Sequence, residues 1–218
     1  MLIINLNLLG KHVVVVGGGD EALKRIETLV GEQCRITVIS ETTNPKIDKL
    51  VEDGKITLKR HKIQDLEFFA RYKPNLVITT TDDRKLNQKI ISHARKKKVI
   101  AYSSDNPESS DYANLAVIDV ENTVQIAVFT GGKSPAMAKK LKTQINRNVK
   151  EMISSDDIKL IRIQEIARRL AKEKIHSQRE RRMFLANIMS DKRIKQLIKD
   201  GMLKKAENRA IAMLRDWR

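Results

Sequence analysis

Three consecutive glycines near the start of the chain, Gly17, Gly18 and Gly19, have the surroundings of a phosphate-binding turn. Four valines, residues 13–16, precede them and are typical of a strand buried on both faces, and helix-forming sequence follows. Gly17, Gly19 and Ala22 fit the spacing G-x-G-x-x-G/A, in which the small residues allow a tight turn, a close approach to pyrophosphate and close helix–strand packing. The free N–H groups that begin the helix then attract an anion. We therefore expect a dinucleotide-binding turn, with a plain strand-to-helix turn as the alternative.

An acidic residue, Glu41, lies about 20 positions beyond the glycines, after the expected strand Arg35–Ile39. A carboxylate at this point of a dinucleotide-binding domain accepts hydrogen bonds from the adenosine ribose. No Arg or Lys lies between Ser40 and Pro45 to bind a 2′-phosphate, so the sequence favours NAD over NADP. The alternative is that Glu41 is a solvated loop residue.

Two more polar segments follow expected strands and should lie at the same edge of the sheet. Thr80, Thr81 and Asp82 end the fourth strand, where we expect them beside the nicotinamide half of a bound cofactor. Asp83 is equally well placed to cap the next helix. Asp105 ends the fifth strand, and its carboxylate could take a proton from a substrate that is being oxidised. The alternative is a polar turn, because Asp-Asn-Pro is good turn sequence.

Alternating strands and helices in the first half of the chain position these side chains. The sequence predicts strands at Val13–Val16, Arg35–Ile39, Ile56–Lys59, Leu76–Thr80 and Val99–Tyr102, and helices near Asp20–Val30, Asn44–Asp53, Asp65–Tyr72 and Arg84–Lys97. This order is typical of right-handed βαβ units. The predicted fold class is therefore α/β, with a Rossmann-like doubly wound parallel sheet.

The second half of the chain has a different pattern. Two short apolar runs within Leu115–Phe129 predict an antiparallel hairpin. Ser134 and Pro135 are a favoured N-cap and first residue of a helix, and they follow a second glycine-rich turn that could bind an anion. From about Asp156 onward, apolar residues at helical spacing predict a helical domain whose apolar residues form its core.

Size and composition limit the possible functions. The longest apolar runs are far too short to span a bilayer, and no basic leader segment suggests export. Cys34 is the only cysteine, which excludes an intramolecular disulfide and favours the cytoplasm. The four histidines are dispersed and form no metal-ligand pattern, so no metal is predicted.

The net charge of +16 is concentrated in the second part of the chain. Residues 1–129 hold 19 Lys and Arg against 17 Asp and Glu, whereas residues 130–218 hold 24 against 10. The excess predicts a polyanionic partner, although a solvated basic face is the alternative. Nucleic acid is a weak candidate because Phe184 and Trp217 are the only aromatic residues after Thr130.

Several spaced motifs, taken in order, resemble the precorrin-2 dehydrogenase family, which is also the N-terminal part of siroheme synthases. The resemblance covers nearly the whole chain. It is carried by Leu6–Gly19, by Thr81-Asp82-Asp83 with Asn87-Gln88, by Asp105 with Pro107, by Thr130–Pro135 and by Glu180–Phe184.

The resemblance implies both an activity and a domain organisation. The family oxidises precorrin-2 to sirohydrochlorin with NAD, and some members also insert iron to make sirohaem. The implied domains are a NAD-binding Rossmann domain at 1–113, a dimerisation segment at 114–152 and a helical domain at 153–218. A homodimer and a carboxylate-rich tetrapyrrole substrate follow, and the basic second half agrees with such a substrate.

Individual residues acquire roles through the same resemblance. Asp105 falls on the aspartate implicated in catalysis. The pairs Asp20-Glu21 and Glu41-Thr42 fall on positions that contact NAD. The chain departs from the family at Tyr102, where Asn is usual, and at Leu115-Ala116, where Pro-Ala is usual. Because both departures lie beside the expected site, a non-catalytic NAD-binding accessory protein of a tetrapyrrole enzyme stays as an alternative.

Overall fold

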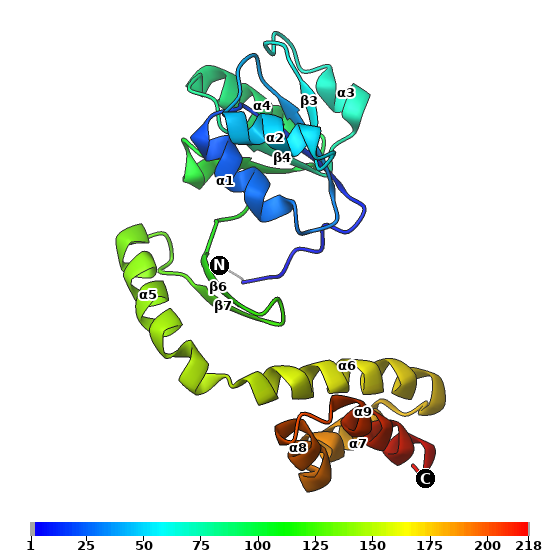
Figure 1. The fold of residues 1–218 in the computed structure, drawn as a ribbon. Helices are drawn as coiled ribbons and strands as arrows, with labels where there is room; N and C mark the ends of the chain where they lie inside the picture. Colours follow the sequence, from blue (N-terminus) through cyan, green and yellow to red (C-terminus); the bar gives the residue numbers. More distant parts are fainter. Residues whose placement is uncertain (1–2, 218) are drawn as a thin grey trace. The chain divides into compact units, whose positions relative to one another are not determined.

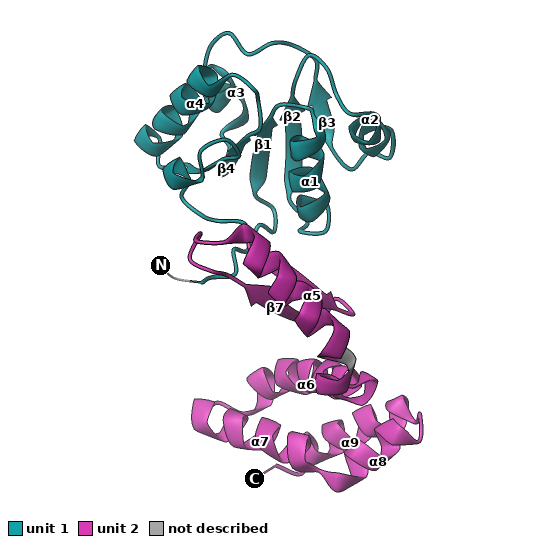
Figure 2. Ribbon diagram, turned by 90° about the vertical axis from the view of Figure 1, so that its left-hand side faces the viewer, with its two compact units in different colours: residues 1–114 teal, residues 115–218 magenta. Residues whose placement is uncertain are grey.

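The computed structural model describes residues 3–217, and the chain divides into two compact units, residues 1–114 and 115–218 (Figure 2). The first unit is an α/β domain, and the second contains a hairpin and helices (Figure 1). These observations confirm the predicted fold class of a Rossmann-like domain followed by a helical region.

The first unit contains one parallel sheet with strand order β3-β2-β1-β4-β5. Its strands are β1 (His12–Val16), β2 (Arg35–Ile39), β3 (Thr57–Lys59), β4 (Leu76–Thr79) and β5 (Ile100–Ser103). Its helices are α1 (Asp20–Leu29), α2 (Pro45–Glu52), α3 (Phe68–Tyr72), α4 (Arg84–Lys96) and the short 3₁₀ helix η1 (Pro107–Ser109). Most boundaries lie within one or two residues of the predictions. The main difference is at α3, which begins at Phe68 because the Asp65 side chain accepts a hydrogen bond from the Glu67 N–H and holds a turn there.

Alternate residues of each strand enter two separate apolar layers. Val13 and Val15 of β1 join a core with the buried residues of α1 and α2, including Ile26 and Ile47. Val14 and Val16 join a second core on the other face, with buried residues of α3 and α4. The run of valines is therefore buried on both sides, and the parallel sheet has helices on both faces.

The register of the sheet brings three strand ends together. Val16 pairs with Ile39 of β2 on one side and with Thr79 of β4 on the other. The chain order reverses between β1 and β4, and ligands bind at this switch point in open α/β sheets. The loops that follow β1, β2 and β4 therefore surround the position where a ligand is expected.

The second unit begins with the hairpin of β6 (Ala116–Val120) and β7 (Val124–Val128). Ile118 is buried, whereas its neighbour Val117 is 39% exposed, because successive residues of a strand face opposite sides and only one side of this hairpin is covered. The helix α5 (Pro135–Met152) contacts both strands. Its start matches the predicted cap, because the Ser134 hydroxyl accepts a hydrogen bond of 3.2 Å from the Met137 N–H.

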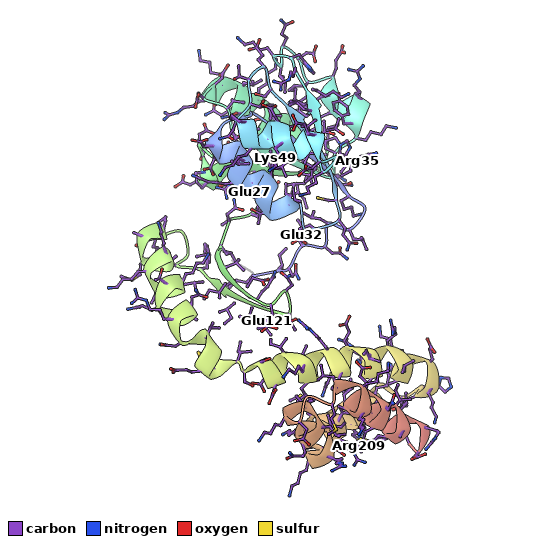
Figure 3. All side chains as sticks on the ribbon, viewed as in Figure 1. Glu27, Glu32, Arg35, Lys49, Glu121 and Arg209 are labelled. Atoms are coloured by element: carbon purple, nitrogen blue, oxygen red, sulfur yellow. The ribbon has the colours of Figure 1, made fainter. Side chains whose placement is uncertain are left out.

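The remaining helices of the second unit pack around one apolar cluster. They are α6 (Ser155–Lys174), α7 (Gln178–Ser190), α8 (Lys192–Lys199) and α9 (Leu203–Arg215). Phe184 and Ile188 of α7 are fully buried in this cluster. Arg209 of α9, labelled in Figure 3, donates hydrogen bonds of 2.9 and 2.6 Å to Asp191, which caps α8. The predicted helical core is therefore present, but five apolar residues expected in it are exposed instead: Ile161, Met183, Met189, Met202 and Leu203.

Candidate functional site

The glycine turn is shaped by two close backbone approaches. A Cβ at Gly17, where φ is +113°, would lie 2.5 Å from Oγ1 of Thr80. A Cβ at Gly18 would lie 2.3 Å from the carbonyl oxygen of Thr42. These two glycines are therefore required by the neighbouring loops of the domain itself.

Gly19 has a different reason to be glycine. No described atom lies within 4 Å of the position where its Cβ would be, and its backbone is extended with φ near −79°. It occupies the N-cap position of α1, and no side chain caps this helix. The start of α1 thus has no side-chain cap and has free space beside the Cα of Gly19, and both features suit the approach of an anion.

The acidic pair at the start of α1 is already engaged within the domain. Asp20 accepts a hydrogen bond of 2.7 Å from the side-chain amide of Asn44. Glu21 forms ion pairs with Lys24 and Arg25 along the helix. Both carboxylates also lie in the first turn of α1, where the helix dipole favours negative charge.

A cleft of about 400 Å³ opens at the carboxyl ends of β1 and β2 and beside the start of α4. Three of the predicted cofactor-binding residues, Gly17, Glu41 and Thr81, line it. Thr42 is turned to the glycine loop instead, where its carbonyl oxygen faces Gly18 and accepts a hydrogen bond of 2.7 Å from Ser40.

Basic side chains that are distant in the sequence also line this cleft. His61 and Lys62 come from the loop after β3, and Lys85 and Lys89 come from α4. No Arg or Lys lies beside Glu41 in the sequence, but the fold adds positive charge to the cleft from two other segments.

The residues after β4 hold the loop against the sheet. Oγ1 of Thr80 donates a hydrogen bond of 3.1 Å to the carbonyl of Val16, so this hydroxyl is bonded to β1. Asp82 is exposed. Asp83 caps α4 by accepting a hydrogen bond of 3.0 Å from the Leu86 N–H, as one of its two predicted roles requires.

Asp105 lies exposed at the end of β5, with two donors behind it. Oγ of Ser103 donates to Oδ1 of Asp105 at 2.6 Å, and Nδ2 of Asn87 donates to the same oxygen at 3.0 Å. Ser103 and Asn87 are both buried. Asn87 belongs to the family motif, but the sequence does not predict its contact with Asp105, because the two residues are 18 positions apart.

The family departure at Tyr102 does not place a new side chain beside Asp105. Tyr102 is buried, with its ring centre 5.1 Å from that of Tyr112 and the Arg25 guanidinium 5.1 Å above it. Successive residues of a strand face opposite sides, so this ring points away from the Ser103 side chain. Burial also raises the pKa of Tyr112. Tyr102 therefore belongs to the core under α1, with Leu23 and Ile26.

The residues that the structure describes give two further findings. No group of three or more His, Cys, Asp or Glu within residues 3–217 is arranged to hold a metal ion. Within the same residues, every helix is too short or too polar to cross a bilayer.

Comparisons with known proteins agree with this architecture. Residues 4–116, slightly more than half of the chain, match the family model described as "Putative NAD(P)-binding". The chain is 28% identical over 156 residues to the precorrin-2 dehydrogenase of Bacillus subtilis, an alignment that covers 72% of this chain and 91% of that protein. It is 30% identical over 173 residues to the siroheme synthase of Methylococcus capsulatus, with coverage of 78% and 34%.

The siroheme synthases are longer proteins, and the aligned part of the chain spans about a third of the Methylococcus protein. A solved structure titled "SirC, precorrin-2 dehydrogenase" is similar in fold, with a TM-score of 0.68 at 20% identity over 95% of this chain and 100% of that one. The chain therefore belongs to this NAD(P)-binding family, and the predicted resemblance to precorrin-2 dehydrogenases and siroheme synthases is confirmed.

Proposed function

We propose that this protein is a NAD-dependent dehydrogenase that oxidises precorrin-2 to sirohydrochlorin in siroheme biosynthesis. The observation that carries the proposal is an exposed carboxylate, Asp105, at the same edge of the sheet as the glycine turn. The names of the relatives support the substrate and the reaction. The three parts predicted from the sequence, at 1–113, 114–152 and 153–218, are proposed as its cofactor, dimerisation and helical domains.

The residues of the first unit fit a dinucleotide. The open space over Gly19 and the uncapped start of α1 would receive the pyrophosphate. Glu41 would bind the adenosine ribose, and Thr81 would line the same cleft. Bound NAD supplies the acceptor for a hydride. We propose NAD over NADP because Glu41 would repel a 2′-phosphate, although three lysines of the same cleft, Lys62, Lys85 and Lys89, would oppose this preference.

The proposed role of Asp105 follows from the balance of the reaction. Oxidation breaks a C–H bond of the substrate, and loss of a hydride must be accompanied by loss of a proton. The two donors behind Asp105 both bind Oδ1, and no described donor binds Oδ2. Oδ2 can therefore face the substrate and take the proton as a general base.

The remaining partners are also proposals. The basic side chains of residues 130–218 suit the carboxylates on the rim of a tetrapyrrole. Iron would enter as a second substrate if the protein is also a chelatase. We propose a homodimer, because the hairpin of β6 and β7 has outer edges that no described strand pairs with.

The direct experiment is an assay of the purified chain with precorrin-2 and NAD, and separately with sirohydrochlorin and iron. Asp105→Asn should lower the rate of NAD reduction about 100-fold or more, the typical contribution of a general base, with NAD affinity nearly unchanged. Glu108→Gln is the matched control, because Glu108 is an exposed carboxylate on η1 a few residues away. If Asp105→Asn keeps most of the activity, the proton is taken elsewhere.

A further inference from the structure

Asn87 is a buried amide whose polar atoms are all engaged. It lies in the first turn of α4 and has no exposed surface. Its Nδ2 donates to the carbonyl of Thr81 at 2.8 Å and to Oδ1 of Asp105 at 3.0 Å, and its Oδ1 accepts from Oγ1 of Thr81 at 2.7 Å. These partners define the amide orientation, because a carbonyl and a carboxylate can only accept.

We propose that Asn87 is a positioning residue that holds Asp105 with Oδ2 directed to the substrate and links this carboxylate to the cofactor loop at Thr81. The inference rests on the proposed function, in which Asp105 takes the proton. It adds a second element to that site, since Asn87 has no exposed surface and would act only through Thr81 and Asp105.

The direction of the hydrogen bonds supports this role. Ser103 donates to Oδ1 of Asp105, so its oxygen can accept from the buried hydroxyl of Thr79, which lies 3.1 Å away. Two neutral donors, Asn87 and Ser103, thus bind one oxygen of the Asp105 carboxylate, and Ser103 itself can accept from the hydroxyl of Thr79. Such a chain polarises its members toward the charge and restricts the rotation of the carboxylate. Because both donors are buried, water does not replace them easily.

The link to Thr81 has its own consequence. Thr81 lines the cleft where the cofactor is proposed to bind, and Asp105 follows a different strand. A single amide therefore connects the loop after β4 with the loop after β5. The hydrogen bonds of the Asn87 amide would then hold Asp105 at a defined distance from Thr81 and so from the bound cofactor.

A double-mutant cycle tests whether Asn87 acts through Asp105. Asn87→Ala should lower kcat about tenfold or more, with a smaller change in KM for precorrin-2. In the Asp105→Asn background the same substitution should lower kcat less than about twofold, because the carboxylate it positions is absent. Equal losses in both backgrounds would overturn the proposal and leave Asn87 with a general structural role.

The hydroxyl pair Ser103 and Ser104 provides a matched control in the same turn. Oγ of Ser104 donates to the carbonyl of Thr79 and not to Asp105. Ser103→Ala should follow the pattern of Asn87→Ala, whereas Ser104→Ala should keep kcat within about twofold of wild type. Ser103→Ala also provides the test if Asn87→Ala does not fold. Equal effects of the two serine substitutions would contradict the proposal.

A crystal structure of Asn87→Ala separates this inference from the proposed reaction. The Asp105 carboxylate should leave its present orientation or adopt several rotamers, whether or not the protein oxidises precorrin-2. An unchanged Asp105 side chain in that variant would overturn the positioning role. Absence of activity in wild type would overturn the proposed function alone.

Discussion

The side-chain amide of Asn44 donates a hydrogen bond of 2.7 Å to the carboxylate of Asp20, across 24 positions of the sequence. The backbone N–H of Asn44 also donates to the carbonyl of Gly18 at 2.7 Å. Asn44 caps α2 as well, so one residue joins the glycine loop to the turn after β2. The two loops expected to contact the cofactor are thus hydrogen-bonded to each other without a ligand. This part of the expected cofactor site is therefore preorganised.

Gly19 and Gly18 should respond differently to substitution. Gly19→Val places a branched side chain where the pyrophosphate is expected, so NAD affinity should fall at least about tenfold, or about 1.4 kcal/mol, while the fold persists. Gly18→Ala should instead lower the melting temperature, because its Cβ meets the Thr42 carbonyl. Titration calorimetry and thermal melts distinguish the two effects. Unchanged NAD affinity in folded Gly19→Val would remove the loop from the proposed cofactor site.

The hairpin predicts a dimer that depends on its apolar outer surface. The wild-type chain should sediment at about twice its 24.9 kDa at micromolar concentration, because paired hairpins would cover the open strand edges. Val117→Lys places a charge on the outward face of β6 and should shift the protein to monomer. The control is Met189→Lys, at another exposed apolar residue, in α7. Wild-type protein that is monomeric throughout this range would contradict the prediction.

The buried imidazole of His12 should make stability depend on pH. Burial lowers the pKa of His12, and the Arg35 guanidinium beside it acts in the same direction, while the hydrogen bond with the Tyr72 carbonyl opposes the shift. The unfolded chain therefore binds this proton at a higher pH than the folded chain. Folding free energy from His12 is fully present above its unfolded pKa of about 6.5 and is lost as the pH falls through the lower folded pKa.

Denaturant melts at pH 7.5 and pH 5.5 measure this contribution. His12→Gln cannot titrate, so its loss of stability between the two pH values should be smaller than that of wild type. His176→Gln removes an exposed histidine of α6's C-terminal loop and should leave the wild-type difference unchanged. Equal pH dependence in wild type and His12→Gln would show that other groups cause the effect.

Asp191 should contribute to the stability of the second unit. It accepts from the Ile194 N–H at 2.7 Å as the cap of α8 and binds Arg209 through both carboxylate oxygens. Asp191→Ala should cost about 1–2 kcal/mol, mostly from the lost cap, because the Arg209 side chain is 42% exposed and water screens its charge. Asp216→Ala, in a largely exposed pair with Arg215, should cost far less.

The ion pair with Arg209 also makes the contribution of Asp191 to stability depend on pH. Hydrogen bonding to Arg209 holds the pKa of Asp191 below its ordinary value. Its stabilising contribution is therefore present above about pH 4 and is lost as the pH falls through the lower folded pKa. Acid titration followed by circular dichroism should show that the helices of Asp191→Ala unfold at a higher pH than those of wild type.

Local patterns in the sequence were sufficient to predict the strands, the helices and the glycine turn. The valines before Gly17, the alternation of the hairpin and the Ser134-Pro135 start of α5 all depend on neighbours within a few residues. Periodicity and capping operate at that range, so these features could be predicted without a structure. The family motifs then identified Asp105 and the pairs Asp20-Glu21 and Glu41-Thr42 as candidates.

Tertiary structure alone decided which of those residues meet. Asn87 reaches Asp105, and Lys62 and Lys89 reach the cleft beside Glu41, only because the strand order places β4 between β1 and β5 and the register aligns the loops that follow. Tyr102 is a core residue under Arg25 for the same reason, since the side of the sheet that it faces depends on strand register. The sequence contains the donors and acceptors, but hydrogen bonds form over about 3 Å, and a sequence does not specify separations between distant segments at that scale.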